Sequence, residues 1–195
     1  MKNRGPAAVT AARWMQRLLA GDWINGIYED CRRVAARSAK DAGAASVSPA
    51  TFFRACLEAL PLPVEVDESM LLRIPASGPV IVVANHPLGG ADAVVLAALV
   101  TALRDDARIM ANHFVCRIPE AAPALIPVDP FAGPDAPRRN AAPLRAALAH
   151  LEAGGLLAAF PAGEVAAWNP RTRRISDRPW NRHVGFLVRR TKATV

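Results

Sequence analysis

The residues of this chain best suited to proton transfer are His86 and Asp92, which stand on either side of a turn sequence. Histidine changes its charge near neutral pH, and an aspartate is a common partner that orients its ring. The pair follows residues 80–84, an uninterrupted apolar run that is typical of a buried strand. Ligand chemistry in α/β sheets gathers at the carboxyl ends of such strands, so we predict a functional site at His86.

Asp92 also has a competing structural role. It directly precedes an apolar stretch at residues 93–104 that is expected to be helical, and it stands where the N-cap of that helix would lie. Pro87 and two adjacent glycines exclude a continuous helix from His86 to Asp92 and demand a tight turn. A compact turn would fold the carboxylate back toward the imidazole, so Asp92 is expected to orient His86, to cap the helix, or to do both.

Short apolar runs alternate with helical segments in the rest of the chain, which predicts an α/β fold with a mixed, largely parallel sheet flanked by helices. The runs expected to be strands are residues 80–84, 108–111, 125–128 and 156–160. A helix is expected at residues 141–153, with Asn140 as its N-cap and Gly154 at its C-terminal end. Residues 129–140 are rich in proline and charge, and we expect them to be a loop that forms a wall of the site.

Residues 1–70 are predicted to be an N-terminal helical segment that precedes an α/β domain at residues 71–195, which carries the predicted site. One helix has an apolar face made by Trp23, Ile24, Ile27, Tyr28, Cys31, Val34 and Ala35. A second helix begins at Ser48 and Pro49, and its apolar face comprises Phe52, Phe53, Cys56, Leu57 and Leu60. We expect these aromatic residues to pack in the core. The alternative is an amphipathic, lipid-facing role for Trp14, Trp23, Phe52 and Phe53.

Composition excludes several classes of protein. A chain of 195 residues that is 52% apolar can bury a core, and it lacks any apolar run of the ~20 residues needed to span a bilayer. Polar residues interrupt its first apolar stretch, which argues against a secretory signal peptide. The three cysteines lack C-x-x-C spacing, so neither a disulfide framework nor a zinc site is expected.

The net charge of +7 is unevenly distributed. Only Asp177 opposes the basic residues of the last 25 positions, which are Arg171, Arg173, Arg174, Arg178, Arg182, Arg189, Arg190 and Lys192. Such a surface is expected to attract phosphate groups or an anionic membrane surface, and a solvated basic face without a partner is the alternative. Nucleic acid is not expected as a partner, because few aromatic residues accompany these charges and no recognition motif is present.

The segment from Asn85 to Asp92 resembles the first signature block of the glycerolipid acyltransferase superfamily, of the lysophosphatidic-acid type. In particular it is similar to the bacterial hemolysin-like lysophospholipid acyltransferase branch. Residues 125–129 resemble the second block, residues 160–164 resemble the third, and residues 184–195 resemble the approach to the fourth, which is a strand in that family. The ordered set covers about residues 71–195 and is more specific than any single block.

This resemblance implies transfer of a fatty acyl group from a thioester to the hydroxyl of a lysophospholipid or related lyso-lipid, as in phospholipid biosynthesis. His86 would be the general base, and Asp92 would orient it and stabilise its charged form. The donor would be acyl-CoA or acyl-carrier protein, with no bound cofactor and no metal. The substrate-binding positions expected are Asn85, Gly89, Gly90, Asp129, Arg138, Arg139, Phe160, Pro161, Gly163 and Glu164, of which the two arginines are candidates outside the family pattern. The enzyme would be peripheral (monotopic) on the cytoplasmic face of a membrane.

The chain departs from the family pattern at several positions. Five residues separate His86 from Asp92, as in the hemolysin-like branch, where the superfamily commonly has four. Pro130 stands where the second block usually has a phosphate-binding arginine, and Ala162 and Glu164 depart from the usual third block. Candidate replacements for the missing phosphate contacts are Arg138, Arg139, Arg173 and Arg174. An acceptor without a glycerol phosphate, such as a lyso-ornithine-type lipid, fits equally well.

Two other functions remain open at this point. The chain could be a catalytically degenerate protein that binds lipid or acyl groups, or a thioesterase or esterase in which water replaces the lipid acceptor. A serine hydrolase is disfavoured, because the chain has no G-x-S-x-G motif. The chain stops at Val195 inside the strand that the family suggests, so its C-terminal part is expected to be truncated.

Overall fold

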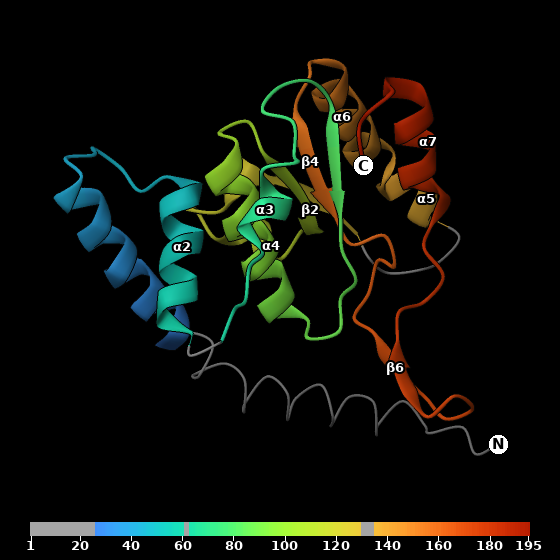
Figure 1. Ribbon diagram of the computed structural model, residues 1–195, viewed down its shortest axis with the longest axis horizontal. Helices are drawn as coiled ribbons and strands as arrows, with labels where there is room; N and C mark the ends of the chain where they lie inside the picture. The colour runs from blue at the N-terminus through green and yellow to red at the C-terminus, as the bar shows by residue number, and fades with distance from the viewer. Residues whose placement is uncertain (1–25, 61–62, 130–134) are drawn as a thin grey trace.

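The computed structural model describes residues 26–60, 63–129 and 135–195, so Trp14, Trp23 and Ile24 lie outside it. Its centre is a four-stranded parallel sheet with the strand order β1-β4-β2-β3 (Figure 1). The strands are β1 Val80–Val83, β2 Arg108–Asn112, β3 Leu125–Val128 and β4 Leu156–Ala159. The predicted α/β class and all four expected strands are confirmed.

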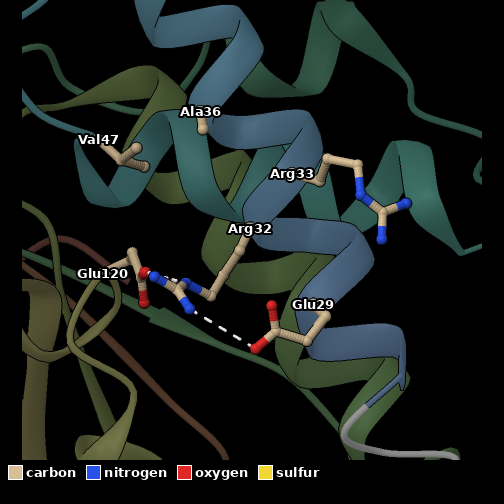
Figure 2. A pocket seen from close by; sticks show the side chains of 6 residues that line it. All are labelled: Glu29, Arg32, Arg33, Ala36, Val47 and Glu120. Carbon is tan, nitrogen blue, oxygen red and sulfur yellow. Dashed lines mark hydrogen bonds and ion pairs between the residues drawn. The ribbon is translucent and has the colours of Figure 1, made fainter.

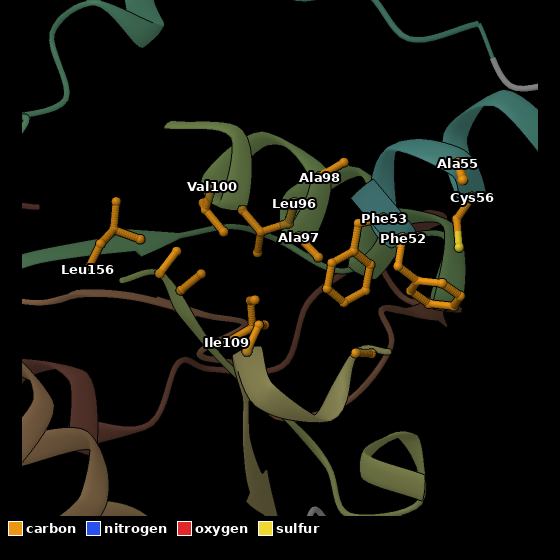
Figure 3. Packing of buried hydrophobic residues seen from close by; sticks show 14 of the residues in the cluster. Phe52, Phe53, Ala55, Cys56, Leu96, Ala97, Ala98, Val100, Ile109 and Leu156 are labelled. Atoms are coloured by element: carbon orange, nitrogen blue, oxygen red, sulfur yellow. The ribbon is translucent and has the colours of Figure 1, made fainter. Parts of the chain in front are cut away.

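Helices cover both faces of this sheet, because side chains of adjacent strand residues point to opposite sides. Val80, Leu156 and Ile109 pack with α4 (Gly90–Leu103) and α2 (Pro49–Ala59), as Figure 3 shows in part. On the other face, buried residues of the strands pack with α6 (Ala141–Glu152) and α7 (Arg182–Thr191). These buried strand residues are Ile81, Leu157 and Ile126. Strands buried on both sides must be apolar throughout, which explains the continuous apolar runs in the sequence.

The N-terminal helices belong to the first of these two layers. Ser48 is the N-cap of α2, and its hydroxyl accepts the Thr51 N–H at 3.1 Å, as predicted. Phe52 and Phe53 are only 3% and 6% exposed and meet edge to face at 5.7 Å, so their core role is confirmed and a lipid-facing role is wrong for them (Figure 3). The helix at residues 26–41 packs against the same cluster.

Hydrogen bonds to one carboxylate connect this helix to the chain between β2 and β3. The Tyr28 hydroxyl donates to Glu120 at 3.0 Å, and Arg32 Nε donates to it at 2.9 Å. Burial and this hydrogen bond raise the pKa of the Tyr28 hydroxyl. A boundary between two units at residue 70 stays a prediction.

Three local expectations are corrected by the structure. The helix after β1 begins at Gly90, three residues earlier than expected, with Gly89 as its N-cap. The predicted loop at residues 129–140 contains a short helix, α5 (Ala136–Arg139). Asn140 precedes α6 as expected, but its side chain makes no capping hydrogen bond. Its amide instead binds the backbone of Asp129, accepting the N–H at 2.9 Å and donating to the carbonyl at 2.8 Å.

The chain after β4 forms a two-stranded antiparallel hairpin that the sequence analysis did not predict. Its strands are β5 (Ala167–Asn169) and β6 (Arg174–Ser176), and it extends away from the main sheet (Figure 1). After α7, Thr194 lies beside the free edge of β1, where its carbonyl accepts the Ile81 N–H at 2.8 Å. Within the described part of the chain, no helix has both the length and the apolarity needed to cross a membrane.

The remaining helical turns are short. They are α3 (Glu68–Leu71), which precedes β1, and two 3-10 turns between β2 and β3, η1 (Val115–Arg117) and η2 (Ala122–Ala124). None of them contributes a predicted site residue.

Candidate active site

The candidate site lies where β1 and β4, which are neighbours in the sheet, both end. Val83 and Ala159 are paired, and His86 and Phe160 follow these two strands in the chain. The chain leaving β1 enters α4 on one face of the sheet, whereas the chain leaving β4 passes through the hairpin to α7 on the opposite face. Such a divergence at the carboxyl ends of parallel strands is where α/β sheets carry their ligand sites.

The turn after β1 brings the His86 and Asp92 side chains together. Nδ1 of His86 lies 3.3 Å from Oδ2 of Asp92, and the two side chains are 16% and 18% exposed. The same oxygen accepts the Leu88 N–H at 2.6 Å. Gly89 makes this reversal with φ +66°, a backbone conformation that favours glycine.

Asp92 therefore lies in the first turn of α4 and not at its N-cap, which corrects the competing role given to it. Its negative charge is favourable there, since the N-terminus of a helix carries partial positive charge. The carboxylate points back over the turn to His86 and the Leu88 N–H.

The chemistry available to this pair follows from the two ring nitrogens. Nδ1 of His86 is buried, and among the described residues it has no aligned hydrogen bond; its ion-pair partner is the Asp92 carboxylate. An Nδ1–H facing that carboxylate leaves Nε2 with a free lone pair. The arrangement can therefore take up a proton at Nε2 and stabilise the imidazolium that results.

Phe160 fixes the plane of the imidazole. Its ring stacks on His86 with the centroids 4.0 Å apart and an interplanar angle of 19°. Pro161, which follows it, is fully buried and anchors this part of the chain. The third predicted block thus contributes a residue in direct contact with the first.

The backbone of His86 is bound from both sides by the segments that flank the hairpin. Ala166, directly before β5, donates its N–H to the His86 carbonyl at 2.9 Å. Asp177, directly after β6, accepts the His86 N–H at 3.2 Å through Oδ1. Its other oxygen accepts the Trp180 indole N–H at 3.3 Å. Asp177 is not among the predicted site residues, although its position as the single acid among eight basic residues was a usable signal.

The second predicted block lies at the opposite edge of the sheet. Asp129 follows β3, which β2 and β4 separate from β1, a distance of about 14 Å at the usual strand spacing. Arg139 Nε is ion-paired with Asp129 Oδ2, so an arginine from α5 stands beside the aspartate that Pro130 follows in the chain. Arg138 is exposed.

The other predicted positions are at the surface around the turn. Asn85 and Gly90 are exposed, and Gly163 makes a turn after Phe160 with φ +75°. Glu164 is ion-paired with Arg178, and both are exposed. Arg173 and Arg174 are on the hairpin and not beside Asp129. His86, Asp92 and Phe160 are thus the predicted residues that the structure places in one cluster.

A separate hollow of about 350 Å³ lies against the helix at residues 26–41, and none of the predicted site residues lines it (Figure 2). Its lining consists of Glu29, Arg32, Arg33, Ala36, Val47 and Glu120. Arg32 bridges the two glutamates there, at 3.6 Å from Glu29 and 2.9 Å from Glu120, so the charges of all three side chains are engaged in ion pairs. The described residues hold no group of three histidines, cysteines or carboxylates that could bind a metal ion.

Comparison with known proteins identifies the family. Residues 9–189 match a family model described as acyltransferase. The matched range includes the whole parallel sheet, the His86–Asp92 turn and the hairpin. No curated protein matches the chain.

Proposed function

Because the chain belongs to this acyltransferase family, we propose that it moves a fatty acyl group from an acyl thioester to the hydroxyl of a lyso-lipid. The observation that carries the proposal is the 3.3 Å approach of the Asp92 carboxylate to Nδ1 of His86, at the carboxyl ends of two neighbouring strands. The family supports acyl transfer, and the roles of individual residues and the lipid acceptor are our inference.

In this proposal His86 is the general base. Nε2 takes the proton of the acceptor hydroxyl as its oxygen attacks the thioester carbonyl, and Asp92 stabilises the imidazolium. Collapse of the tetrahedral intermediate forms the C–O ester bond and breaks the C–S bond, and the imidazolium returns the proton to the departing thiolate. Phe160, stacked on the ring at 4.0 Å, restricts its rotation during both proton transfers.

We further propose acyl-CoA or acyl-carrier protein as donor, and a peripheral location on the cytoplasmic face of an anionic membrane. Five residues between His86 and Asp92 favour the hemolysin-like branch. The Asp129–Arg139 pair is a candidate for binding the acceptor head-group, because it lies at the same carboxyl-terminal end of the strands as His86, although β4 and β2 separate the two positions. Arg139→Gln should then raise the acceptor KM and leave kcat nearly unchanged.

The test is to incubate the protein with labelled acyl-CoA and a panel of lysophospholipids. Wild type should form acylated lipid, and His86→Ala should reduce the rate by about 10²- to 10⁴-fold, because a general base contributes about that much. His183→Ala is the matched control, since His183 is exposed on α7 and its side chain makes no hydrogen bond with the described residues. Free fatty acid as the product would show a thioesterase instead, and binding without turnover would show a degenerate relative.

A further inference from the structure

The β5–β6 hairpin carries an apolar face that no other described part of the chain covers. Trp168 and Ile175 are directly opposite each other in the hairpin, so their side chains share one face. They are 61% and 62% exposed. An isolated two-stranded hairpin is at best marginally stable in water, so a surface that covers this face would also stabilise the hairpin.

Basic residues surround this apolar pair at the tip of the hairpin. Arg171 and Arg173 lie in the turn, and Arg174 begins β6. The single acid after Glu164 is Asp177, and its two oxygens already accept hydrogen bonds from His86 and Trp180. The partner must therefore be apolar and anionic together, and a protein or nucleic acid with charge alone would leave Trp168 and Ile175 uncovered.

The base of the hairpin is hydrogen-bonded to the candidate catalytic residue. Ala166 and Asp177, which flank the two strands, bind the carbonyl and the N–H of His86. Val165 lies near the His86 turn, since a Cβ added at Gly89 would come within 3.4 Å of its Cγ2. The turn of the hairpin projects about 10–13 Å from this base at the usual rise per strand residue.

We infer that this hairpin is the element that contacts an anionic lipid bilayer. Tryptophan and isoleucine enter the boundary between head-groups and acyl chains, and the arginines at the tip bind anionic head-groups. The inference rests on the proposed function in one respect: a lyso-lipid acceptor is a reason for the enzyme to visit a membrane.

The experiment measures binding of the full chain to sedimented vesicles of phosphatidylcholine, with and without ~30% phosphatidylglycerol, which supplies anionic charge. Arg171→Glu with Arg173→Glu should weaken binding to the anionic vesicles by about 30-fold or more. Trp168→Ala with Ile175→Ala should weaken it by about tenfold or more. The matched control is Arg37→Glu with Lys40→Glu, which makes the same change in net charge on exposed positions of the helix at residues 26–41.

Three results would overturn the inference. The first is a loss of vesicle binding in the control pair as large as that in the arginine variant. The second is unchanged vesicle binding in both hairpin variants. The third is that soluble polyglutamate displaces wild type and the Trp168→Ala/Ile175→Ala variant from vesicles equally well. The binding assay needs no turnover, so it separates this inference from the proposed function. An inactive protein that binds vesicles through the hairpin refutes the proposed function alone. If the enzyme is active and its hairpin variants bind vesicles as tightly as wild type, the inference is refuted and the proposed function is not.

Discussion

At the scale of single residues, the position of His86 depends on contacts that are far away in sequence. Its ring meets Asp92 and Phe160, and its backbone is bound by Ala166 and Asp177. A base must be held close to its reactive geometry, because a 1 Å displacement costs about 100-fold in rate. Asp177 is therefore expected to act as a positioning residue that has no contact with substrate.

Asp177→Ala should lower kcat of acyl transfer about tenfold to 100-fold with little change in acceptor KM, because the His86 N–H loses its acceptor. Asp177→Asn keeps an oxygen that can accept this N–H and should recover most of the activity. Steady-state kinetics of both variants provide the check. Equal losses in both, or an effect on KM alone, would contradict a positioning role.

At the scale of elements, Arg104 connects α4 to the amino-terminal ends of the strands, at the opposite end from the candidate site. This buried guanidinium donates to the carbonyls of Gly78 at 2.8 Å and of Gly154 at 2.6 Å, residues that precede β1 and β4. It also makes a two-fold hydrogen bond with Asp106, at 2.8 and 2.6 Å. One side chain thus fixes the starts of two strands relative to the end of α4.

Arg104→Met should lower the free energy of unfolding by about 2–4 kcal/mol, because it leaves partly buried carbonyls without their donor. Chemical denaturation measures this change, and Arg37→Met, at an exposed position, is the control. A loss equal to that of the control would show that water replaces the guanidinium at no cost.

The Arg104–Asp106 pair also has a pH signature. The hydrogen bond from Arg104 holds the pKa of the Asp106 carboxyl below its usual range. A lowered folded-state pKa contributes stability that is fully present above the unfolded value of about 3.9 and is lost as pH falls through the folded value. Asp106 is 46% exposed, so solvent limits the contribution to about 1 kcal/mol or less. Asp106→Asn should therefore be less stable than wild type at pH 6, and the difference should vanish near pH 2; a constant difference would contradict this origin.

At the scale of the whole molecule, the helix at residues 26–41 and the sheet share one apolar core. Cys31 of that helix and Cys56 of α2 are both buried free thiols in the cluster that includes Val80. Burial, followed by the contact with Cys31, raises the pKa of the Cys56 thiol. The thiolate is the reactive form, so Cys56 should be inert in the folded protein.

Iodoacetamide at pH 8 should modify Cys56 only after unfolding, and half-buried Cys116 should react before it. Glu120→Gln, which weakens the contacts with Tyr28 and Arg32, should hasten modification of Cys56 by loosening the helix at residues 26–41. Mass spectrometry of peptides after timed labelling measures both rates. Rapid labelling of Cys56 in the native wild type would contradict a shared core.

Much of the fold was predictable because it depends on neighbours along the chain. The apolar runs of β1 and β4 predict strands buried on both faces, and Ser48 followed by Pro49 predicts the start of α2. The placement of His86 directly after β1 follows from the same local pattern. These features need only backbone propensity and hydrophobic periodicity, which act over a few residues.

The strand order β1-β4-β2-β3, the β5–β6 hairpin and the partners of His86 depended on packing instead. Asp177 is 91 residues from His86, and Arg139 reaches Asp129 from a short helix that replaces part of a predicted loop. The role of Asp92 was also not predictable from the local sequence. Gly89 is the N-cap of α4, which leaves the Asp92 carboxylate in the first turn, where it faces His86. Such pairings arise once the two apolar layers close on the sheet, and no local propensity encodes which distant side chains then meet.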